Sequence, residues 1–118
     1  MGAAAQYYAP RSTGREVVDN RESSSNDPGL LLLISLAAGP KHGHAMLLDV
    51  ERFAGVRLGP GTLYGALTRL EEQGDVEAMA AEGRRRPYRL TSHGRHRLEL
   101  RLGNLDRAVQ TGLARVAS

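Results

Sequence analysis

The chain has 118 residues, 41% of them hydrophobic, and a formal net charge of +3, which suits one small domain with an aliphatic core. It contains no cysteine, which excludes disulfides, thiolate metal sites and cysteine nucleophiles. The longest strongly apolar run, residues 30–38, is far too short to cross a bilayer, and the first 20 residues lack the apolar core of a secretory signal. We therefore expect a cytoplasmic protein without a membrane partner.

The first 26 residues are rich in Ala, Ser, Gly and mixed charge without a sustained period, which predicts a flexible N-terminal arm over residues 1–26. A short helical turn over 15–20 is compatible with the same segment. The pair Asp27-Pro28 then supplies an N-cap and a first-position proline for a helix over 29–38. Gly39-Pro40 ends this helix, which we expect to form the centre of the core.

A second helix is predicted over 43–54, because apolar residues recur there on one face and Gly55 can close it. Its inward positions are Met46, Leu47, Val50 and Phe53 or Ala54. Residues 56–58 are apolar enough to add a short strand to the hairpin that follows later in the chain.

A third helix is predicted between Pro60, which suits a first helical position, and Gly74, which can close a helix in the left-handed conformation. It buries one narrow stripe, made by Leu63, Leu67 and Leu70. The outer face carries small or hydrogen-bonding residues beside Tyr64, namely Thr62, Gly65, Thr68 and Arg69. Such a face lets the helix backbone approach a DNA groove while a few side chains reach out.

Two alternating segments, 75–80 and 87–91, predict an antiparallel hairpin with Glu82-Gly83 near its tip. The hairpin carries Arg84, Arg85 and Arg86 and opens an arginine-rich stretch, 84–101, with seven arginines against one acid. The rest of the chain has nine basic and twelve acidic side chains, so the positive charge is local. Guanidinium groups on a wing suit phosphate or minor-groove contact. The alternative is a solvated loop that only maintains solubility.

A last helix over 92–118 is predicted after a cap by Thr91 or Ser92. It carries an apolar stripe of Leu98, Leu102, Leu105, Val109, Leu113 and Val116. The stripe is longer than one small domain needs, so we expect these residues to pack on a second subunit. The alternative is a single helix that lies flat on the core or frays after Gly103, since Gly103 and Gly112 weaken a helix.

Several motifs lie in a characteristic order between about residues 28 and 102. They are Leu31-Leu32-Leu33 with Gly39-Pro40, His42-Gly43, Gly61-Thr62-Leu63-Tyr64 with Leu67, Leu70-Glu71 and Gly74, and Arg85–Thr91 (RRPYRLT) with Gly94. As a set, they make the chain resemble the PadR family of winged-helix transcriptional regulators, in its compact branch with one short C-terminal helix. The resemblance implies a mainly α fold with a small β-hairpin: a winged helix-turn-helix over 27–91 and a dimerisation helix over 92–118.

The resemblance also implies a function: a homodimeric regulator, most often a repressor, that binds an inverted-repeat operator in double-stranded DNA. Family members often respond to a small hydrophobic or aromatic effector. Two departures weaken the expectation of a flat aromatic effector here. The chain has Gly43-His44 where the family commonly has Gly-Tyr, and it has no tryptophan.

Roles carry over to residues of this chain as expectations. Thr62, Thr68 and Arg69 are candidates for base-edge or phosphate contact, with simple surface exposure as the alternative. Tyr64 is expected at the rim of its helix with its hydroxyl on a phosphate, or else as a half-buried core residue. The remaining DNA candidates are Lys41 and His42 at the start of the second helix and Arg84, Arg85 and Arg86 on the wing.

Other classes of function find little support in the residues. The chain shows no phosphate-binding loop, no paired acids in an apolar setting and no nucleophile signature, so we expect no enzyme activity and no cofactor. His93 and His96 lie three residues apart, but without cysteine or a nearby carboxylate set we interpret them as solvated and expect no metal site. The competing function is a winged-helix module that binds another protein without reading DNA.

Overall fold

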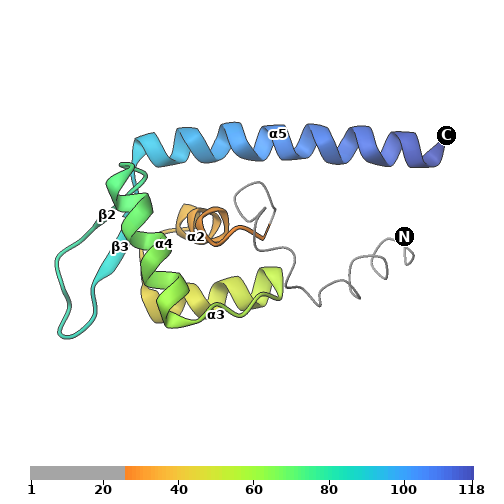
Figure 1. The fold of residues 1–118 in the computed structure, drawn as a ribbon. Helices are drawn as coiled ribbons and strands as arrows, with labels where there is room; N and C mark the ends of the chain where they lie inside the picture. Colours follow the sequence, from red (N-terminus) through yellow and green to blue (C-terminus); the bar gives the residue numbers. More distant parts are fainter. Residues whose placement is uncertain (1–25) are drawn as a thin grey trace.

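The computed structural model of the chain describes residues 26–118, and the predicted flexible arm over 1–26 lies almost wholly outside the described residues. The described part is mainly helical with one small antiparallel sheet (Figure 1), which confirms the predicted fold class. The elements follow in the order α2 (Pro28–Ala37), β1 (Lys41–His42), α3 (Gly43–Ala54), α4 (Pro60–Glu72), β2 (Val76–Ala78), β3 (Pro87–Leu90) and α5 (Ser92–Ala117).

Helix α2 is the central element, and α3, α4, β3 and α5 all pack against it. The Asp27 side chain caps its N-terminus, because Oδ2 accepts a hydrogen bond from the Leu30 amide at 3.0 Å. The helix begins at Pro28, the first position that the Asp27-Pro28 pair predicts, and leucines surround its axis, so almost every side is buried. The core cluster joins α2 to single faces of the other helices and consists of Leu30, Leu31, Leu32, Leu33, Leu36, Met46, Val50, Leu63, Ala66, Leu67, Leu70, Val76 and Leu98.

Helix α4 begins and ends as its sequence predicts. Gly74 has a φ of 81°, and its amide donates to the Glu71 carbonyl. The Asp75 amide donates to the Leu70 carbonyl at 2.9 Å, which completes a Schellman motif. The motif satisfies two carbonyls at the end of α4 and turns the chain directly into β2.

The sheet has the order β1-β3-β2, with both pairs antiparallel. Its third strand is β1, where Lys41 lies opposite Tyr88, so the prediction of a third strand over 56–58 was wrong. Residues 56–58 instead connect α3 to α4, and Val56 and Leu58 pack partly buried against the core. Their apolar character therefore reflects packing rather than strand pairing.

The hairpin between β2 and β3 forms the wing, which we define as residues 76–90. Its paired strands are shorter than predicted, but the tip lies where the sequence placed it. Glu82 and Arg85 exchange two backbone hydrogen bonds, and Gly83 between them has a φ of 64°. Gly83 is the first of the two central residues of this turn, and glycine adopts a positive φ there without strain.

Helix α5 is continuous from Ser92 to Ala117, and the Thr91 hydroxyl caps it by accepting from the Gly94 amide at 2.9 Å. Neither Gly103 nor Gly112 interrupts the helix, which contradicts the alternative of a helix that loses its structure after Gly103. Figure 1 shows α5 running well past the end of α2, and every residue from Asp106 onward is exposed. The alternative of a helix lying flat on the core is therefore also wrong. Within residues 26–118, no helix is both long enough and apolar enough to cross a membrane.

Candidate nucleic-acid interface

The outer face of α4 is open to solvent. Thr62, Gly65, Thr68 and Arg69 are all exposed, and a Cβ built on Gly65 would meet nothing within 4 Å. The Thr68 hydroxyl donates to the Tyr64 carbonyl at 2.9 Å, which holds this side chain close to its own helix. The face is thus smooth and accessible, which a helix that enters a DNA groove requires.

Tyr64 is 51% exposed and lies across the start of α3. A Cβ built on Gly43 would lie 2.6 Å from the Tyr64 hydroxyl oxygen and 3.0 Å from Leu63 Cδ2, so a side chain at position 43 would have to displace the ring. This contact explains the glycine at the start of α3. It places the Tyr64 hydroxyl beside the N-terminus of α3. Contact of this hydroxyl with a phosphate stays a prediction.

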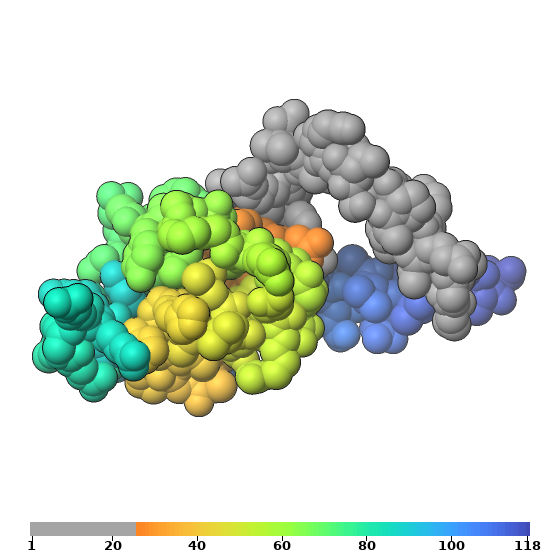
Figure 2. Space-filling view, turned by 90° about the horizontal axis from the view of Figure 1, so that it is seen from below, coloured from red at the N-terminus to blue at the C-terminus, as the bar shows by residue number. Residues whose placement is uncertain are grey.

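The wing stands at one end of the molecule beside α4 (Figure 2). Arg84, Arg85 and Arg86 at and beside its tip are exposed and form no ion pair among residues 26–118. Arg85 Nη1 lies 3.5 Å from His42 Nε2, so the wing tip meets strand β1. The structure therefore brings His42 and Arg85 together, next to the start of α3.

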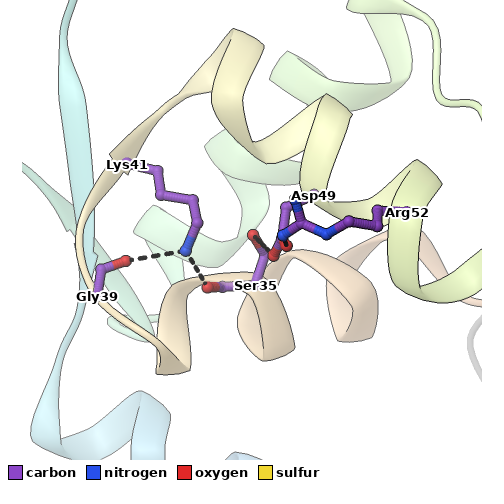
Figure 3. A network of polar contacts seen from close by, with 5 residues as sticks. All are labelled: Ser35, Gly39, Lys41, Asp49 and Arg52. Atoms are coloured by element: carbon purple, nitrogen blue, oxygen red, sulfur yellow. Dashed lines mark hydrogen bonds and ion pairs between the residues drawn. The ribbon is translucent and has the colours of Figure 1, made fainter.

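Lys41 has a different environment. Its Nζ donates to the Ser35 carbonyl at 2.6 Å and lies 3.4 Å from the Gly39 carbonyl, so the ammonium group stabilises the carbonyl end of α2 (Figure 3). The same network continues from the Ser35 hydroxyl, which donates to Asp49 Oδ2 at 2.7 Å, to Arg52 on Asp49 Oδ1. A phosphate contact by Lys41 would have to compete with these carbonyls.

Three of the seven arginines between 84 and 101 pair with carboxylates. Arg89 pairs with Glu77 across the wing, Arg97 with the buried Asp75, and Arg101 with Asp27. The positive charge left for a partner is therefore concentrated at the wing tip rather than spread along the stretch. The sequence showed the excess of arginine, but it did not show these pairs, because their partners lie 12, 22 and 74 residues away along the chain.

Tyr88 lies on β3 with its ring packed partly against the core. Burial raises the pKa of its phenol above the ordinary value of 10.0, and the Glu71 carboxylate acts in the same direction, while Arg86 opposes them. Tyr88 therefore stays neutral and serves as packing between the wing and the core.

This pKa makes the stability depend on pH in the alkaline range. Above about pH 10, the unfolded chain releases the Tyr88 proton while the folded chain keeps it, so the free energy of unfolding falls as the pH rises. We expect this fall to be smaller in Tyr88→Phe than in the unchanged protein. Urea unfolding between pH 8 and pH 11 checks the expectation, and equal slopes in both proteins would contradict it.

A cavity of about 200 Å³ lies between α2, α4 and α5. Its lining is mostly polar and includes three arginines, so it does not have the character of an apolar pocket for a hydrophobic effector. The lining residues are Asp27, Gly29, Leu33, Ala66, Arg69, Leu70, Gln73, Arg97 and Arg101. Arg69 thus borders both this cavity and the outer face of α4.

The apolar stripe of α5 divides into two parts. Leu98 belongs to the buried core, and Leu105 packs partly against it, so Leu98 does not belong with the predicted dimer contacts. The outer part is exposed and consists of Leu102, Val109, Leu113 and Val116. We call these four residues the exposed stripe.

Comparison with known proteins identifies the family. The model of the Transcriptional regulator PadR-like family matches residues 31–100, which span α2, the wing and the first third of α5. The chain belongs to this family. A curated relative, an uncharacterized 37.1 kDa protein in transposon TN4556 of Streptomyces fradiae, is 49% identical over 75 residues. That match covers 64% of the PadR-like chain but only 22% of the relative, so the chain corresponds to about a fifth of that protein.

Solved structures share the fold. A PadR family transcription regulator from Clostridium difficile R20291 superposes with a TM-score of 0.67 at 21% identity, covering 77% of this chain and 98% of that one. A PadR family transcriptional regulator from Eggerthella lenta gives a TM-score of 0.64 at 23% identity and covers 97% of both chains. The PadR-like chain therefore shares the fold of these regulators over most of its length.

Proposed function

We propose that this PadR-like chain is a DNA-binding transcriptional repressor that acts as a homodimer on an inverted-repeat operator. In this proposal α4 enters the major groove, and the arginines at the wing tip hold the neighbouring backbone or minor groove. The exposed stripe of α5 joins two copies. Release by a small-molecule effector stays an expectation from the family resemblance.

One observation carries the proposal: the small-residue face of α4 and the arginines at the wing tip are both exposed, and the wing lies beside α4 at one end of the molecule (Figure 2). A winged domain that used α4 for internal packing would bury this face. The N-cap of α4 supports the same conclusion. Gly59 offers no side-chain acceptor, so the first amides of α4 remain available to a phosphate.

A gel-shift series across salt concentrations tests DNA binding directly. We expect the logarithm of affinity to fall linearly with the logarithm of salt, because each neutralised phosphate contributes about −0.9 to the slope. Absence of binding to both the promoter of its own gene and random duplex DNA would exclude the repressor and favour the protein-binding module.

Removing the wing charge gives a sharper expectation. Arg84→Ala with Arg86→Ala should weaken binding to all sequences by a similar factor and flatten the salt slope by up to about 1.8, two phosphate contacts. The matched control is Arg107→Ala with Arg115→Ala, which removes the same charge from the far half of α5. If the wing variant keeps both the affinity and the slope of the unchanged protein, the wing does not contact DNA.

A further inference from the structure

Asp75 joins the end of α4 to the start of α5. Its side chain is fully buried, with 0% exposure, and its residue follows the glycine that closes α4. The Asp75 carbonyl accepts a hydrogen bond from the Thr91 amide at 3.0 Å. The Thr91 hydroxyl lies 2.6 Å from the Gly74 carbonyl and 3.1 Å from that of Asp75, so the residue that caps α5 is fixed to the turn that ends α4.

One turn into α5, the two backbones touch. A Cβ built on Gly94 would lie 2.0 Å from the Asp75 carbonyl oxygen and 2.8 Å from its carbonyl carbon. Real Cβ atoms do not approach backbone this closely, so only glycine permits the contact. The approach fixes the distance between α5 and the end of α4 without any intervening side chain.

A further turn along, the Asp75 side chain holds α5 by charge. Arg97 Nε lies 2.9 Å from Asp75 Oδ1, and His93 Nε2 lies 3.6 Å from the same atom. The arginine contact is an ion pair rather than an aligned hydrogen bond, since both carboxylate oxygens lack a hydrogen bond of good geometry among residues 26–118. Arg101 repeats the arrangement on Asp27 at 3.3 Å, at the start of α2.

These contacts lie at Thr91, Gly94, Arg97 and Arg101, which follow one side of α5 over about three turns. We call the contacts of the first three residues with Asp75 the joint. Because they are spaced along the helix, they fix both the angle of α5 to α4 and its rotation about its own axis. The rotation also sets the direction in which the exposed stripe points, because the stripe is in phase with Leu98, which packs on the core.

We propose that the joint sets the separation of the two α4 helices in the dimer and so selects the spacing between the half-sites of the operator. In this role Asp75 and Arg97 are positioning residues: they touch no base, and they act through the direction of α5. The inference rests on the proposed homodimeric DNA-binding function.

Because α5 is long, a small change of angle at the joint produces a large displacement at the far end of the helix. Its 26 residues span about 39 Å at 1.5 Å per residue. A change of about 5° at the joint moves the far end of such a rod by about 3.4 Å, the rise of one base pair. Half-site spacing is therefore expected to respond to angular changes that leave the winged domain intact.

The experiment measures the separation of the α4 helices with and without the joint. Since the chain has no cysteine, Thr62→Cys places one spin label per subunit on the exposed face of α4. We expect a narrow distance distribution between the two labels in the dimer. Asp75→Asn and Arg97→Gln should each broaden it or shift its mean by about 3 Å or more. Arg95→Gln removes the same charge two residues away from Arg97 and should change nothing.

A second readout uses duplexes that carry the half-site selected by the unchanged protein, with spacers that differ by single base pairs. The unchanged protein should prefer one spacing, and the two joint variants should lose this preference while keeping the half-site sequence. Arg97 is the exposed partner of the Arg97–Asp75 ion pair, so Arg97→Gln should fold normally. It therefore tests the joint even if Asp75→Asn does not fold.

The outcomes separate the two proposals. If the labelled protein without a joint substitution shows no distance between two labels, the protein is not a dimer, and the proposed function is wrong. If both variants stay dimeric, bind the duplexes, and keep an equally narrow label distance and the same preferred spacing, only the proposal about the joint is wrong.

Discussion

Gly94→Ala is expected to lower the free energy of unfolding by about 2–3 kcal/mol, the upper part of the range for overpacked sites. The added methyl would overlap the carbonyl oxygen, the carbonyl carbon and the Cα of Asp75, all closer than 3.0 Å. Each of these is backbone of a fully buried residue, so relief requires α5 to move away from the end of α4. Thermal unfolding at fixed protein concentration should show a midpoint lower by roughly 10 °C or more.

Gly103→Ala is the matched control for this prediction. It places the same methyl in the same helix, but a Cβ at this position meets nothing within 4 Å. Alanine there should stabilise the protein by about 0.5–1 kcal/mol, because glycine in a helix interior loses more conformational freedom on folding. Equal effects of the two substitutions would show that helix propensity decides the outcome and that Gly94 does not approach Asp75 closely.

Local signals explain why α4 and the wing could be predicted from the sequence. Pro60 and Gly74 act through their own backbone preferences, and the turn at Glu82-Gly83 needs only one glycine between two alternating segments. Such signals are complete within a few residues. The same holds for Asp27 and Thr91, whose caps are bonds to amides three residues ahead.

Features that depend on distant partners could not be predicted. A two-residue strand such as β1 has no period, and it exists only because β3 offers an edge to Lys41 and His42. The Lys41 ammonium is engaged by carbonyls that only the fold brings near it. Asp75 looked like the first residue of a strand, whereas its main role is contact with a helix that starts 17 residues later.

The candidate DNA-binding and dimer surfaces also combine features that the sequence could predict with features that it could not. Exposure of the α4 outer face followed from the single apolar stripe on its other side, because a helix with one narrow stripe buries only that stripe. The stripe of α5 was more ambiguous. Leu98 and Val109 have the same residue class and the same phase, yet one is buried in the core and the other is 53% exposed. Periodicity gives the face of a helix, but not the point at which the helix leaves its own domain.

Val109→Asp with Leu113→Asp should convert the protein to a monomer that remains folded. Both side chains are more than half exposed and lie beyond the part of α5 that packs on the core, so the winged domain keeps its contacts. In a dimer these positions would be buried, and unpaired carboxylates there are costly. Sedimentation should show one subunit, and circular dichroism should show an unchanged melt of the winged domain.

Operator affinity should fall by about 10²–10⁴-fold in this variant, because two linked half-site contacts become one. Leu100→Asp is the control: Leu100 is 58% exposed on the same helix, yet at 3.6 residues per turn it faces the side opposite to Val109 and Leu113. A general effect of charge on α5 would act at all three positions, whereas an interface along the exposed stripe leaves Leu100→Asp dimeric with full affinity. If the double variant stays dimeric, the subunits meet elsewhere, and the exposed stripe needs a different partner.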